Sequence, residues 1–137
     1  MGQNLPMIKR VPSTPAPAPA SRSVSNAAHD LLYVLSTYAA NFELVVSAWK
    51  ARDIYEVVNE EFTALMQLQQ AAFPEAAMVM IDLVIAHNDI AVVLLDFHKA
   101  HVEKTTPRFT EQEMSRRLAV HALAVDALRD FVLRKTH

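Results

Sequence analysis

The six histidines are the side chains of this chain most able to do chemistry, because imidazole titrates near neutral pH and is a common metal ligand. His98 and His101 lie three residues apart, so a helix would place them on one face. His121 lies further along the chain, and Glu103 follows His101 after one residue. Because zinc takes three or four protein ligands, these residues are the candidates for a metal site.

The predicted positions of the histidines nevertheless argue against one shared site, and we expect no bound metal or cofactor. At about 1.5 Å per helical residue, His29 would lie more than roughly 30 Å along a bundle from His98. His121 would fall near the level of Leu94 and Leu95. It could approach His98 only with a helix rotation that the sequence does not specify.

The polar residues within apolar helices also have structural interpretations. We expect His121, at a core position, to be a neutral histidine hydrogen-bonded to a neighbour. His87 and Asn88 interrupt a long apolar helix, as residues that set helix register or face a partner chain do. They could be buried within one chain or between two. The H-x-x-x-x-D spacing of His121 and Asp126 is similar to that of hemerythrin-like proteins, but the second helix lacks the histidine that this family carries there.

Composition excludes several kinds of active site. The chain has no cysteine, which rules out disulfides, thiolate metal sites and a cysteine nucleophile. Its one glycine is Gly2, so no glycine-rich phosphate loop exists. The adjacent Glu60 and Glu61 would point to different helix faces and would not form an acid–base pair. We therefore expect no enzyme, and the net charge of −2 predicts no nucleic-acid partner.

The apolar pattern predicts two helices in the first half of the chain. The first spans about residues 26–50, with Ser25 or Asn26 as its N-cap. The second spans about residues 54–72 and begins after Asp53. The core row of the first helix recurs in steps of three and four: Ala28, Leu31, Leu35, Tyr38, Phe42, Val45 and Trp49.

Two further helices are predicted in the second half. One begins at Pro74 and spans residues 74–104, and the other spans residues 111–135 with Thr110 and Glu113 as a capping box. The helix at 74–104 has two neighbouring apolar rows, which indicates a central helix in contact with two others. The first row is Ala77, Ile81, Val84, Asn88, Ala91 and Leu95, and the second is Met80, Leu83, His87, Ile90, Leu94 and Phe97.

These four amphipathic helices with short connections predict an all-α fold, an up-down-up-down antiparallel four-helix bundle at residues 26–137. Residues 1–25 are rich in proline, alanine and serine and predict a disordered tail, either a spacer or a docking or secretion segment. No signal peptide is expected, because prolines at 12–19 replace its apolar region. No transmembrane segment is expected, because Asp82 and Asp89 interrupt the most apolar stretch. The expected location is the cytoplasm.

The helix lengths indicate one surface for a partner. Folded back from Pro74, the helix at 54–72 would leave the end of the helix at 74–104 uncovered. The large apolar side chains at that end, our partner-binding candidates, are Trp49, Tyr55, Phe97 and Val102. They would bind a protein or a second copy of the chain, unless the last helix and the loop at Pro107 cover them.

The leading interpretation is a non-enzymatic protein–protein interaction module. One alternative is a metal-binding four-helix bundle that uses His98, His101 and His121 of the last two helices. Another is an amphipathic protein that opens its helices on a lipid or granule surface, although the slightly acidic charge argues against it.

Overall fold

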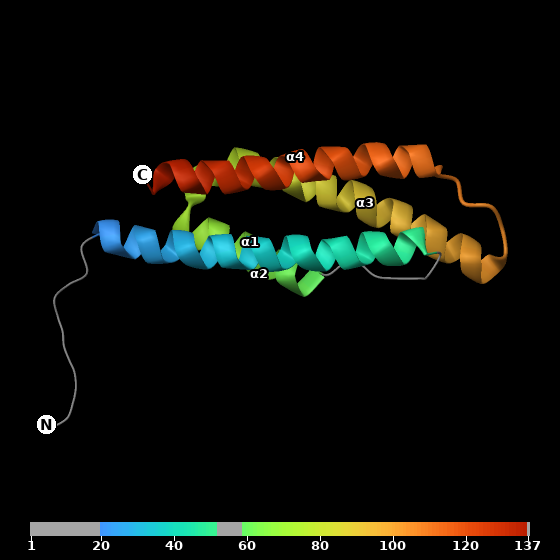
Figure 1. Ribbon diagram of the computed structural model, residues 1–137, viewed down its shortest axis with the longest axis horizontal. Helices are drawn as coiled ribbons and strands as arrows, with labels where there is room; N and C mark the ends of the chain where they lie inside the picture. The colour runs from blue at the N-terminus through green and yellow to red at the C-terminus, as the bar shows by residue number, and fades with distance from the viewer. Residues whose placement is uncertain (1–19, 52–58, 137) are drawn as a thin grey trace, which may run out of the picture.

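A computed structural model describes residues 20–51 and 59–136, and within these ranges the chain folds into four α-helices (Figure 1). The helices are α1 (Ala20–Lys50), α2 (Asn59–Ala72), α3 (Ala77–Glu103) and α4 (Glu111–Lys135). A single 3-10 turn, η1 (Pro74–Ala76), leads into α3. The predicted all-α fold is confirmed.

Successive helices run in opposite directions, which gives the predicted up-down-up-down bundle (Figure 1). α1 packs against α2 and α4, while α3 packs against α4 and α2. α2 has 14 residues and α3 has 27, so α2 cannot cover the whole of α3. The end of α3 and the loop to α4 consequently project at one end of the molecule (Figure 1).

The predicted core row of α1 is buried along its whole length, from Ala28 to Trp49. The helix itself begins at Ala20, six residues before the expected start, so Ser25 and Asn26 lie inside it. The rest of the predicted tail, residues 1–19, lies outside the described residues, as do Asp53 and Tyr55.

Local sequence explains where the later helices begin. Pro74 occupies the first position of η1, where its fixed φ suits a helix and its missing N–H is not needed. The Thr110 side chain accepts a hydrogen bond from the backbone N–H of Glu113 at 3.1 Å and caps α4. The Glu113 carboxylate pairs with Arg116 at 2.8 Å.

α3 ends at a residue with left-handed backbone geometry. Lys104 has φ 57° and ψ 43°, and the following N–H, from Thr105, donates to the carbonyl of Ala100 at 2.9 Å. Glycine usually fills this position because it lacks a Cβ. Since the one glycine of the chain is Gly2, a lysine has to take the conformation here.

Only one of the two predicted apolar rows of α3 lies in the core. Most of the second row is buried and Phe97 is half-buried. In the first row Ile81, Asn88 and Leu95 are exposed. α3 does contact two helices, as predicted, but the first row contributes to the core only in part, through the half-buried Val84.

Candidate functional site

The most unusual feature of the core is a hydrogen-bonded network of three titratable side chains. The Tyr38 hydroxyl, on α1, lies 2.8 Å from Nδ1 of His87 on α3. The same hydroxyl lies 2.7 Å from Nε2 of His121 on α4. Side chains from three helices thus meet at one oxygen atom.

Aromatic rings enclose this network. The Phe62 ring of α2 stacks on His87 with centroids 3.9 Å apart and an interplanar angle of 3°. The Phe42 ring stacks on His121 at 4.0 Å and 19°. Each imidazole therefore has one polar edge at Tyr38 and an apolar ring against its face, a well-packed arrangement.

Burial keeps the network uncharged near neutral pH. It lowers the pKa of His87 to about 4. It also lowers the pKa of His121 to about 4, with a smaller contribution from the nearby His87. Burial raises the pKa of the Tyr38 hydroxyl. Transfer of these groups from water disfavours their charged forms, so both imidazoles and the phenol are neutral at pH 7.

The shared hydroxyl couples the tautomers of the two histidines. Tyr38 has one proton to donate, so it donates to one imidazole and accepts an N–H from the other. A general acid–base catalyst needs a pKa near the working pH, which these histidines lack. The expected neutral, hydrogen-bonded His121 is confirmed, and His87 is buried within this single chain.

The structure does not bring the three metal candidates together. His121 lies at the level of His87, not near Leu94 and Leu95 as the sequence led us to expect. At about 1.5 Å per residue, His98 and His101 lie roughly 16 and 21 Å further along α3. No group of three or more potential ligands assembles in the described ranges.

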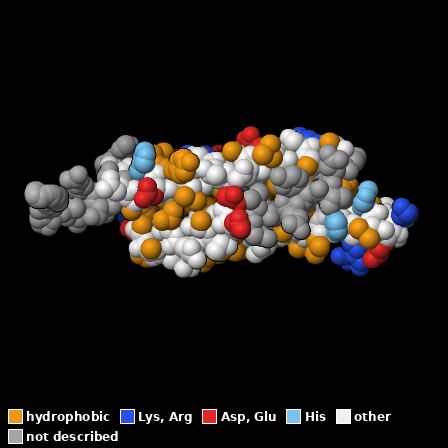
Figure 2. All heavy atoms as spheres, turned by 90° about the horizontal axis from the view of Figure 1, so that it is seen from below, with side chains coloured by type: hydrophobic (Ala, Val, Ile, Leu, Met, Phe, Trp, Pro, Cys, Tyr) orange, Lys and Arg blue, Asp and Glu red, His pale blue; other side chains and the backbone are white. Residues whose placement is uncertain are grey.

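His98 and His101 are both exposed, as is Glu103. In Figure 2, histidine side chains lie beside basic ones at the end of the molecule where α3 finishes. His98 and His101 are therefore solvated, whereas His121 is enclosed in the core.

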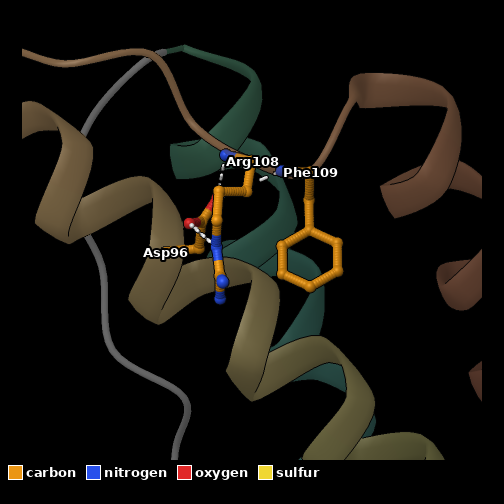
Figure 3. A network of polar contacts seen from close by, with 3 residues as sticks. All are labelled: Asp96, Arg108 and Phe109. Carbon is orange, nitrogen blue, oxygen red and sulfur yellow. Dashed lines mark hydrogen bonds and ion pairs between the residues drawn. The ribbon is translucent and has the colours of Figure 1, made fainter.

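The loop between α3 and α4 covers part of the predicted partner-binding end. The Asp96 carboxylate accepts the backbone N–H groups of Arg108 at 2.8 Å and Phe109 at 3.2 Å (Figure 3). Arg108 Nε approaches the same carboxylate at 3.4 Å. These bonds hold the loop against α3, and the Arg117 guanidinium lies 4.7 Å from the centre of the Phe109 ring.

The partner-binding candidates consequently differ in exposure. Trp49 is buried and Phe97 is half-buried, and both line a recess with Pro107 and Phe109 of that loop. Val102 is 64% exposed. The loop therefore covers Trp49 and Phe97, which was the alternative considered from the sequence. It leaves Val102 uncovered.

The sequence interpretation missed an exposed apolar row on α3. The exposed residues of α3 include a set spaced alternately by three and four positions, which we call the outer row: Met78, Ile81, Ile85, Asn88, Val92, Leu95, Lys99 and Val102. Six of these eight side chains are apolar. On α4, Val120 and Leu123 are exposed as well, and Val120 shares a surface recess with Ala86 and Asp89 of α3.

The apolar character of α3 also bears on the membrane prediction. Asn26–Lys50 and Pro74–Glu103 are each long enough to cross a membrane, and each contains an 18-residue stretch apolar enough to do so. The criterion is one of length and composition, which a core helix of a bundle can also meet. The segment containing α3 is the more apolar of the two, although Asp82 and Asp89 interrupt it.

A second hollow lies between α1 and α4. It has a volume of about 520 Å³ and is lined by Phe42, Val46, Leu118, His121 and Val125 among others. We call it the α1–α4 groove. His121 thus contacts Tyr38 on one side and borders this groove on the other.

No family model, no curated protein and no solved structure matches the chain. Its function therefore has to be inferred from its own residues.

Proposed function

We propose that the protein is a non-enzymatic interaction module that associates with a second copy of itself through the outer row of α3. The observation that carries this proposal is the exposure of a heptad-spaced row of mainly apolar side chains on the most apolar helix. Leu95 is 68% exposed and Met78 is 74% exposed. Exposed apolar surfaces of this extent are typical of protein–protein contact sites.

The spacing of the outer row favours another helix as the occupant. Alternating steps of three and four residues are the pattern by which two helices pack side by side. A row of this kind fits a copy of itself related by a two-fold axis, because the same patch serves both partners. Asn88, in the middle of the row, is the kind of polar residue that specifies register in such pairs.

The charges beside the outer row also suit a second copy. Asp89 borders one surface recess together with Arg116 and Arg117 of α4. Groups of both signs therefore lie on one flank, and a two-fold axis can place an acid of one copy near a base of the other. The acidic groups at Asp82 and Asp89 make an anionic lipid surface the less favourable occupant, because membrane-surface helices carry lysine and arginine there.

The buried network supports the non-enzymatic part of the proposal. Its histidines titrate near pH 4, and its phenol titrates above its usual range, so it offers no acid or base suited to neutral pH. The metal-binding alternative has lost its main support, because His121 is distant from His98 and His101.

Sedimentation equilibrium of the full chain, from micromolar to submillimolar concentration, tests the proposal. We expect a reversible monomer–dimer equilibrium for the native protein. The double variant Ile85→Glu/Leu95→Glu should be monomeric, because it places charges in the contact. The matched control is Leu44→Glu on α1, where the native side chain is 58% exposed outside the outer row, and it should still dimerise.

Circular dichroism should show the same helix content in all three proteins. A native chain that stays monomeric at every concentration contradicts the proposal. So does a Leu44→Glu variant that loses the dimer as completely as the double variant does.

A further inference from the structure

The α1–α4 groove has the properties of a small-molecule site, and it lies apart from the outer row of α3. Its volume of about 520 Å³ falls in the range of ligand pockets. Phe42 and Val46 on α1 and Leu118 and Val125 on α4 give it apolar walls. Such a hollow suits a compact apolar body, provided that a polar group inside it can fix the orientation of the ligand.

His121 supplies that polar group. Its side chain is 95% buried, since 5% of its surface is exposed, and it lines the groove. Nε2 is bonded to Tyr38, whereas Nδ1 makes no hydrogen bond within the described part of the chain. Because His121 lines the groove and its Nε2 is bonded to Tyr38, Nδ1 is the nitrogen that a ligand in the groove would meet.

The network behind His121 determines what this nitrogen can bind. When Tyr38 donates its proton to Nε2 of His121, the proton of His121 lies on Nδ1, which then donates. When Tyr38 donates to His87, His121 donates to Tyr38 and its Nδ1 accepts. The groove can therefore present either a donor or an acceptor at the same position. A hydroxyl group matches both states, because it donates one hydrogen bond and accepts others.

The charged groups along the groove favour an uncharged ligand. Lys50 and Arg129 are basic, and Glu43 and Asp126 are acidic, so the formal charges of the lining cancel. Arg129 is also paired with Asp126 at 2.8 Å. The lining therefore carries no net charge that would favour a carboxylate or an ammonium group, and hydrogen bonding is the main polar contribution to binding.

We propose that the α1–α4 groove binds a small apolar molecule that carries a hydroxyl group, with the hydroxyl bonded to Nδ1 of His121. The hydroxyl extends the chain of hydrogen bonds from His87 through Tyr38 to His121. The apolar body packs on Phe42, Val46, Leu118 and Val125. A ligand without the hydroxyl leaves the buried nitrogen without a partner, which selects against it.

Two probes with the same apolar body test the inference: 4-ethylphenol and ethylbenzene. NMR titration of the full chain, followed at the imidazole nitrogens of His121, should show saturable binding of 4-ethylphenol with a shift at Nδ1. Ethylbenzene should bind at least about tenfold more weakly, because it leaves Nδ1 unbonded. The variant His121→Phe should lose this discrimination.

A second variant avoids any change in the core. Ala122 is an exposed residue of α4 that lines the groove, and Ala122→Trp should fill it and abolish saturable binding of 4-ethylphenol. Ala119 is exposed on the same helix but does not line the groove, so Ala119→Trp is the matched control and should bind normally.

Three outcomes overturn the proposal. The first is no saturable binding of 4-ethylphenol to the native chain. The second is equal affinity for ethylbenzene, which would make the groove a purely apolar hollow. The third is unchanged binding to Ala122→Trp, which would place the ligand elsewhere. If His121→Phe does not fold, the Ala122→Trp and Ala119→Trp pair still decides the question.

Discussion

The two faces of α3 are both apolar, yet one forms the core and the other faces solvent. The inner face carries Leu83 and Ile90, both with no exposed surface, and the outer face carries Ile85 and Leu95, both largely exposed. Hydrophobicity alone therefore does not decide which face of this helix is buried. The difference lies in what the other helices supply, since α4 and α2 pack on the inner face.

The neighbouring residues His87 and Asn88 show the difference most clearly. His87 points inward, where Tyr38 bonds its Nδ1 and Phe62 stacks on its ring. Asn88 points outward in the exposed row. A buried polar group requires a hydrogen-bond partner, and Tyr38 provides one only on the inner face. The network thus belongs to the core on the inner face, whereas the side chains of the outer row are exposed.

Truncation of one leucine on each face of α3 should give the largest difference in the free energy of unfolding. Leu83→Ala removes a fully buried side chain and should lower the free energy of unfolding by about 2–5 kcal/mol. Leu95→Ala, at monomer concentrations, should change it by less than about 0.5 kcal/mol. Urea denaturation followed by circular dichroism measures both. Similar losses for the two variants would mean that the outer face is also a core in the monomer.

Acidification should lower the free energy of unfolding through the two histidines buried against the inner face, His87 and His121. The pKa of His87 and of His121 is lowered to about 4 in the folded state, whereas an unfolded histidine has a pKa of about 6.5. The unfolded chain therefore binds more protons between these values, so stability is fully present above about pH 6.5 and is lost as the pH falls towards 4. We expect a loss of about 2 kcal/mol for each of the two histidines, or about 4 kcal/mol in all, between pH 7 and about pH 5.

Urea denaturation at several pH values measures this loss. His98→Gln, a substitution at an exposed histidine, is the control and should leave the pH dependence unchanged. A native protein whose stability is flat from neutral pH to pH 5 would contradict the neutral, enclosed state of His87 and His121.

Removal of the Tyr38 hydroxyl should lower the free energy of unfolding by a smaller amount. Tyr38→Phe keeps the ring in the core but removes the hydroxyl that bonds both imidazoles, and we expect a loss of about 1–2 kcal/mol at neutral pH. Thermal and urea denaturation measure it. Tyr33→Phe, on the exposed side of α1, should cost almost nothing. Equal effects of the two substitutions would show that the hydroxyl at Tyr38 contributes no net stability.

The smallest expected effect on the free energy of unfolding concerns Lys104, at the C-terminal end of α3. Lys104 has a left-handed backbone conformation, which is strained for a residue with a Cβ, so Lys104→Gly removes that strain. The same substitution raises the conformational entropy of the unfolded chain, which partly offsets the gain. We expect a net gain of about 0.5 kcal/mol in the free energy of unfolding. Lys99→Gly, inside α3, should instead lower it by about 1 kcal/mol. Loss of stability in Lys104→Gly would indicate that the lysine side chain contributes there.

Much of the fold could be predicted because it depends on local signals. The apolar period of α1, the proline at the start of η1 and the cap at Thr110 each act within one or two turns of helix. The start of α1 at Ala20 was not predicted, because Ser25 is a favourable N-cap that the helix does not use.

The Tyr38 network could not be predicted, because its members are 49 and 83 residues apart in sequence. Their meeting depends on the rotation of three helices about their own axes, which no single helix specifies. A signal was nevertheless present, since Tyr38, His87 and His121 each occupy a position predicted to lie in the core. The outer row of α3 was missed for a related reason: two adjacent apolar rows do not reveal which one has a partner.

Trp49 is the single tryptophan of the chain, and its place in the fold gives the molecule an intrinsic optical reporter. Its indole lines a recess together with Phe97 of α3 and with Pro107 and Phe109 of the α3–α4 loop. Asp96 holds this loop in place by accepting the backbone N–H of Phe109. Its emission wavelength depends on how much water reaches the ring. Fluorescence of the unlabelled protein would therefore report on the seating of the α3–α4 loop, independently of the helix content of the bundle.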